Sequence, residues 1–196
     1  MVSANELEEL AETSRKLIAQ FAEQLNSELS HALQEGGPQN AIAICKLKAP
    51  KIALANSIDG WIIRRTSLKT RNPENDPDDF ELKILNEFEE KKSEGHDISQ
   101  LAYYKMTEVG NQSEFRYIKA IPVGEICLQC HGQDLSETLI HQLDAQYPQD
   151  KARNFKLGDI RGAFTLRKIF SRDVPELEQE PSTETVNLPQ YDENGG

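Results

Sequence analysis

The sequence contains one motif whose residue types and spacing define a particular chemistry, Cys127-Leu128-Gln129-Cys130-His131. This C-x-x-C-H pattern is the attachment sequence of c-type haem. On one turn of helix, two thiols three residues apart lie on the same face and can form thioether bonds with the two vinyl groups of a haem, while the adjacent imidazole can bind iron. We therefore expect one covalent haem c, with Cys127 and Cys130 as attachment sites and His131 as the proximal iron ligand.

Two other uses of the motif cysteines are open on the sequence alone. A C-x-x-C pair can be a reactive dithiol, although no buried strand of a βαβ unit precedes this one. A zinc site could combine Cys45, Cys127, Cys130 and His141. Structural zinc sites usually supply two paired knuckles, however, and Cys45 and His141 stand alone. Haem attachment explains the adjacent histidine better than either alternative.

A haem iron with one histidine ligand has a second axial position, for which the sequence offers few candidates. They are Cys45, Met106, His31, His96 and His141. Met106 lies in a predicted strand, where methionine usually fills core space, and the three histidines are interpreted as solvated or hydrogen-bonded residues. Cys45 follows the apolar stretch 41–44, where a thiol can be an inert packing group or, in an oxidising compartment, a ligand protected from mispairing. Composition leaves both roles of Cys45 open.

Basic residues are concentrated between positions 46 and 71, which contain seven lysines and arginines against one acid, Asp59. Arg64 and Arg65 lie in a predicted strand, and alternation along a strand sends them to opposite faces. Either arginine could bind a haem propionate while the other faces solvent or a partner. The bases could equally balance neighbouring carboxylates.

The pattern of apolar residues and turn formers predicts an α+β domain with an antiparallel sheet and a long amphipathic N-terminal helix. Gly36-Gly37-Pro38 should end that helix, and a second helical stretch should be interrupted or restarted at Pro50. Asp78 and Glu81 resemble a capping box after the turn-rich loop 72–77. The expected helices cover 7–33, 40–57 and 78–95, and the expected strands cover 61–68, 101–109, 114–121 and 162–170.

Composition limits the classes of function. The chain has 196 residues and a formal net charge of −11, which argues against general affinity for nucleic acid. No apolar run reaches the roughly 18 to 20 residues of a membrane span, and no export signal is visible at the start. We expect three parts: an N-terminal helix (1–37), a haem-binding domain (38–170) and an acidic tail (171–196) that buries too little apolar surface to order.

Four blocks together resemble a family of single-haem c-type proteins with a PAS-like fold, known as a domain of unknown function. The blocks are 41–53 (AIAICKLKAPKIA), 61–78 (WIIRRTSLKTRNPENDPD), the CLQCHG stretch and 158–163 (GDIRGA). The resemblance covers about residues 5–170. It implies a PAS-like antiparallel sheet flanked by helices, with Cys45 as the axial ligand opposite His131. It also implies an extracytoplasmic location, thylakoid lumen or periplasm, so we expect a mature form to which Met1 has been added.

The sequence therefore favours a redox protein over an enzyme, because nothing else in it resembles a catalytic site. An anionic thiolate ligand favours ferric iron, so we expect a low reduction potential. Electron transfer with an unidentified partner protein and redox or gas sensing both fit, and the N-terminal helix could form a homodimer seam. The alternative is a peroxidase-type haem enzyme with a labile axial site.

Overall fold

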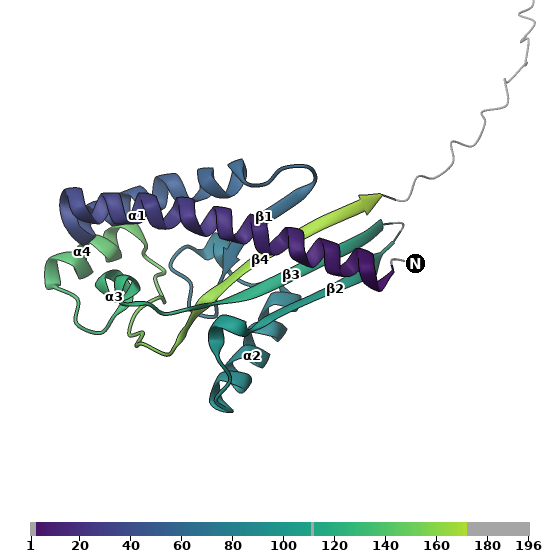
Figure 1. The fold of residues 1–196 in the computed structure, drawn as a ribbon. Coiled ribbons are helices and arrows are strands. Elements are labelled where there is room, and N and C mark those ends of the chain that lie inside the picture. The colour runs from purple at the N-terminus through teal and green to yellow at the C-terminus, as the bar shows by residue number, and fades with distance from the viewer. Residues whose placement is uncertain (1–2, 111, 172–196) are drawn as a thin grey trace, which may run out of the picture.

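The structure is a computed structural model that describes residues 3–110 and 112–171 (Figure 1). A four-stranded antiparallel sheet forms its centre, with helices on both faces and at one end. In chain order the elements are α1 (Ala4–Ala55), β1 (Trp61–Thr66), the 3₁₀ turn η1 (Pro73–Asn75), α2 (Asp79–Ser93), the 3₁₀ turn η2 (Ile98–Gln100), β2 (Ala102–Val109), β3 (Gln112–Pro122), α3 (Glu125–His131), α4 (Glu137–Gln146) and β4 (Ile160–Ser171). The predicted α+β class is confirmed. Apart from Ser171, the expected acidic tail (171–196) lies outside the described residues. The expected boundary between the N-terminal helix (1–37) and the haem-binding domain (38–170) stays a prediction.

Helix α1 is a helical hairpin, because its backbone leaves the helical conformation at Gly36 and Gly37. Gly37 has φ +66°, a left-handed conformation that favours glycine, so the predicted end of the first helix is confirmed. The two segments run side by side (Figure 1). Lys48 and Glu28 form an ion pair across them at 2.5 Å, and the side-chain amide of Asn56 donates a hydrogen bond to that of Gln24 at 2.8 Å.

The second segment of α1 is helical, as predicted, but the expected interruption at Pro50 is wrong. Pro50 lies within the helix, and the only non-helical dihedrals inside α1 are those of the two glycines. Proline removes one helical hydrogen bond. Ala41, Ile42 and Ala49 are buried, so tertiary packing of this segment outweighs that loss.

The sheet has the strand order β1-β4-β3-β2, and all three pairings are antiparallel. Strands β2 and β3 form the predicted hairpin, with Val109 opposite Gln112. At the start of β4, a Cβ on Gly162 would lie 2.3 Å from the carbonyl oxygen of Thr66. Only glycine allows β4 to approach the end of β1 this closely, which brings residues 65–71 beside Arg161.

Two apolar clusters hold the layers together. On one sheet face, Phe21 and other side chains of α1 pack against Trp61, Phe115 and Tyr117. On the other face, Phe88 and its neighbours on α2 pack against Ile118 and the adjoining strands. Helix α2 begins at the predicted capping box, in which Asp78 and Glu81 each accept a hydrogen bond from the other's backbone N–H. Within the described ranges, no helix combines the length and apolar character needed to cross a membrane.

Candidate functional site

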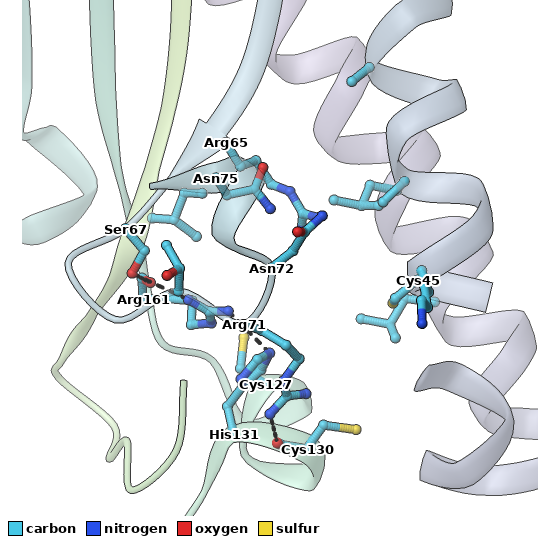
Figure 2. Close-up of a pocket in the computed structure, with 18 of the residues that line it drawn as sticks. Cys45, Arg65, Ser67, Arg71, Asn72, Asn75, Cys127, Cys130, His131 and Arg161 are labelled. Carbon is cyan, nitrogen blue, oxygen red and sulfur yellow. Dashed lines mark hydrogen bonds between the residues drawn. The ribbon is translucent and has the colours of Figure 1, made fainter. Parts of the chain in front are cut away.

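A cavity of about 470 Å³ lies between the α1 hairpin and the end of the sheet that carries α3 and α4. One wall is the second segment of α1, another is the end of β1 with the loop that follows it, and a third is α3 with the start of β4. Its lining includes Cys127, Cys130 and His131 from α3 and Cys45 from α1. In Figure 2, Cys45 stands on the opposite side of the cavity from the other three residues. The fold therefore gathers all four of these predicted residues around one space.

Helix α3 is a short element whose end is tied to the chain that follows. The N–H groups of Asn154 and Phe155 donate to the carbonyl oxygens of Gly132 and His131, at 3.2 and 3.0 Å. A Cβ on Gly132 would lie 2.6 Å from the carbonyl oxygen of Leu128, so glycine is required directly after the motif. These contacts set the orientation in which His131 leaves the helix.

The imidazole of His131 is held in one tautomer. Its Nδ1 lies 2.7 Å from the carbonyl oxygen of Ala152, which can only accept, so Nδ1 carries the proton. The lone pair of Nε2 then faces the cavity. Burial, together with the positive charges of Arg161 and Arg71, lowers the pKa of His131 well below its ordinary value. The side chain is therefore neutral at neutral pH, the form in which histidine binds a metal.

A buried carboxylate, Asp150, organises the loop that supplies this carbonyl. Asp150 is 1% exposed and pairs with Arg71 at 3.2 Å and Arg153 at 2.9 Å. Burial raises the pKa of Asp150, but the two arginines and the N–H of Ala152 outweigh it and lower the pKa overall. Arg71 in turn donates to the carbonyl oxygens of Cys130 and Ala152, at 2.7 and 3.2 Å. Asp150 thus positions two backbone groups next to His131: the Ala152 carbonyl that accepts from its ring and, through Arg71, the Cys130 carbonyl.

Among the candidates for a second axial ligand, Cys45 alone lines the cavity. Burial raises the pKa of its thiol, and the charges of nearby arginines partly offset this. His31 and His96 are exposed and each pairs with a glutamate. His141 is exposed as well, and Met106 packs against the core cluster beneath α1. The zinc alternative is not supported, since His141 is not in the cavity and no three or more His, Cys, Asp or Glu side chains of the described residues lie close enough together to hold one metal ion.

The two arginines expected to meet an anionic group have different environments. Arg64 pairs with Glu81, which is 1% exposed, and donates to the carbonyl oxygens of Glu74 and Asp76. Both Arg64 and Arg65 line the cavity, but of the two only Arg64 has a carboxylate partner among the described residues. The described chain contains eight arginines, and six of them form an ion pair with Asp or Glu. Within this part of the chain, the two without such a pair are Arg65 and Arg161, and both line the cavity.

Sequence reasoning missed three residues of the site, Arg71, Tyr147 and Arg161. The ring of Tyr147 closes part of the cavity, with the Lys46 ammonium 5.5 Å from its centre and the Arg71 guanidinium 6.0 Å away. The pKa of Arg161 is lowered to about 10, mainly by burial and also by the positive charges of Arg65 and Arg71, so Arg161 stays charged at neutral pH. The available signal was the GDIRGA block, whose second glycine packs against β1 and so places Arg161 at the cavity.

The comparisons with known proteins identify a family and a fold relative of this chain. The sequence model of the Tll0287-like family matches residues 4–168. The chain belongs to this family. A solved structure, the crystal structure of the cyanobacterial haem protein Tll0287, superposes with a TM-score of 0.56 at 25% identity and covers 81% of this chain and 93% of its own. The search of curated proteins found no match. The family and this fold relative support the antiparallel α+β architecture.

Proposed function

We propose that this member of the Tll0287-like family binds one haem c in the cavity, attached through Cys127 and Cys130. His131 is the proximal iron ligand and Cys45 the ligand on the opposite side. The observation that carries the proposal is the neutral His131 with its Nε2 lone pair turned into a cavity that also holds both motif cysteines and Cys45. The solved relative is itself described as a haem protein, which supports the choice of cofactor.

The residues of the cavity fit a haem in two further ways. The walls are largely apolar, with side chains such as Phe21, Leu25, Leu29 and Ile126 that can contact a porphyrin ring. The same cavity holds two arginines without a carboxylate partner in the described part of the chain. Both are partly buried, and cations withdrawn from water favour an anionic partner, so a ligand with an apolar body and negative groups complements this lining.

When bound there, a haem supplies an iron that takes up and releases one electron. The hydrogen bond from Nδ1 to Ala152 keeps the His131 ring in place and raises its basicity as a ligand. Cys45 as a thiolate ligand favours ferric iron, so the haem iron should have a low reduction potential. We propose electron transfer or redox and gas sensing as its role. We also propose a location outside the cytoplasm, in the thylakoid lumen or periplasm, because haem c is attached there.

An electron carrier and a redox or gas sensor differ in what His131 and Cys45 do when the iron is reduced. A carrier keeps His131 and Cys45 as ligands in both oxidation states, because a constant site needs little reorganisation. A sensor needs an element that changes, and release of Cys45 on reduction would be such a change.

Optical spectra of oxidised and reduced protein, with a pyridine haemochrome assay, test the proposal. The protein has to be matured in a host that attaches haem c. We expect a c-type haemochrome and ferric bands typical of sulfur ligation. In Cys45→Ser the sulfur bands should disappear, while His141→Ala, which changes an exposed histidine, should leave the spectrum unchanged. A ferric spectrum that is the same in Cys45→Ser and wild type would remove Cys45 from the iron.

A further inference from the structure

We propose that Arg65 and Arg161 form a carboxylate-binding pair that holds the two propionates of the cofactor, and that Arg161 changes partner from His131 to a propionate when the cofactor enters. This inference rests on the proposed function, because it takes a haem as the ligand of the cavity. It assigns a role to Arg161 and selects Arg65 over its neighbour Arg64.

The first argument is the pairing of charges. Every arginine of residues 3–110 and 112–171 has a carboxylate partner, except Arg65 and Arg161. The polar contacts of Arg161 are with neutral groups, namely the Ser67 hydroxyl at 3.4 Å, the Lys69 carbonyl at 3.5 Å and His131. Both arginine side chains are partly buried, and a cation withdrawn from water is stabilised most strongly by an anion. Two such cations face one cavity, and a haem carries two carboxylates.

The position of these two arginines suits a single ligand. Arg65 lies in β1 opposite Phe164 of β4, and Arg161 lies three residues before Phe164. Both guanidinium groups therefore come from neighbouring strands at the end of the sheet. Figure 2 shows them on the β-strand side of the cavity, with Cys45 on the helix across from them. Arg64 is the matched control, because it also lines the cavity and is next in sequence to Arg65, but its charge is already paired with Glu81.

The second argument is the contact between Arg161 and His131. The Arg161 guanidinium lies 3.3 Å from Nε2, and it can only donate. Nε2 has one lone pair, because the proton of the ring is on Nδ1. That lone pair cannot accept from Arg161 and bind iron at the same time. Arg161 therefore loses this acceptor when iron binds, and a propionate is the anionic group that arrives with the iron.

The pair should act as a specificity determinant for a free-acid porphyrin. Hydrogen bonds to charged groups are strong enough that each arginine should contribute about tenfold to a hundredfold in affinity. An esterified porphyrin has the same ring but no carboxylates, so it should gain nothing from either arginine.

The test is a titration of the unloaded chain, kept reduced, with four probes: haemin, haemin dimethyl ester, metal-free protoporphyrin and protoporphyrin dimethyl ester. Wild type should prefer each acid over its ester. Arg65→Ala and Arg161→Ala should each lower the affinity for the acids about tenfold or more and leave the esters unchanged. Arg64→Ala should keep the wild-type preference. The metal-free pair shows that the effect comes from the carboxylates and not from the iron or His131.

Arg161→Lys separates charge from loop packing. In Arg161, Nη1 donates to Ser67 and Lys69 while Nη2 contacts His131. Lysine keeps the charge but has a single nitrogen in place of these two, so it should retain part of the preference for acids. A preference unchanged in both alanine variants would overturn the arginine pair, and so would an equal loss for acids and esters. Equal binding of acid and ester by wild type contradicts the pair alone. A chain that binds none of the four porphyrins contradicts the proposed function itself.

Discussion

Replacing Asp150 by asparagine should destabilise the unloaded protein strongly, although the new side chain has nearly the same shape. The carboxylate is 1% exposed, and the Arg71 side chain that it pairs with is 12% exposed. Arg153 keeps a second partner, Asp144 at 2.5 Å, so the loss falls on Arg71. Breaking a buried pair costs about 3–5 kcal/mol. At roughly 2–4 °C per kcal/mol for a chain of this size, the melting temperature should fall by about 6–20 °C.

The pH dependence gives this prediction its sign. The folded pKa of Asp150 is lowered, so its charge stabilises the fold above the unfolded pKa of about 4. That stabilisation is lost as the pH falls through the lower folded pKa. The difference in unfolding free energy between wild type and Asp150→Asn should therefore be largest at neutral pH and shrink below about pH 4.

Urea unfolding followed by circular dichroism at several pH values measures both effects. Asp144→Asn is the control, because Asp144 is 59% exposed and an exposed pair contributes about 0–1 kcal/mol. The reasoning would be refuted if Asp150→Asn changed stability no more than Asp144→Asn does. A difference that stayed constant from pH 7 to pH 3 would refute the assigned pKa direction.

Further predictions concern the opposite wall of the cavity, the far face of the sheet, a close strand contact and the iron. Cys45→Ser should raise the midpoint potential by on the order of 100 mV, within the about 0.8 V that axial ligands span, and potentiometry showing no change would exclude thiolate ligation. Glu81→Gln removes a carboxylate that is 1% exposed and pairs with Arg64 and Arg116; Arg116 keeps Asp78 and Glu114, so the unfolding free energy should fall by about 1–3 kcal/mol, and urea unfolding at the wild-type midpoint would contradict this. Gly162→Ala should cost about 1–3 kcal/mol, because its Cβ would meet the Thr66 carbonyl; wild-type stability would show that the strands can separate. If Cys45 leaves the iron on reduction, carbon monoxide should bind the ferrous protein, and a spectrum without an adduct would support the carrier role.

Features that depend on neighbouring residues could be predicted from the sequence. The capping box of Asp78 and Glu81 acts within one helical turn, so its pattern alone predicts where α2 begins. The glycine pair 36–37 acts on its own backbone and ends the first helix where expected. Pro50 shows the limit of such reasoning, because burial of one helix face outweighs the hydrogen bond that proline removes.

The partners of charged residues could not be predicted, because they depend on contacts between distant segments. Strand alternation separates Arg64 from Arg65, but both line the cavity, and nothing local indicates that Arg64 meets the buried Glu81 while Arg65 has no carboxylate partner in the described residues. Asp150 and Arg71 are 79 positions apart, and only the folded chain brings them together. The contact between Arg161 and His131 likewise needs β4 to pack beside β1, which depends on Gly162.

The most direct test of the central claim is the intact mass of protein matured in a host that attaches haem c. The account predicts the mass of the polypeptide plus one haem, stable to denaturation, with the addition lost when Cys127 and Cys130 are both replaced by alanine. The mass of the bare polypeptide from a host that loads a control c-type cytochrome would contradict it.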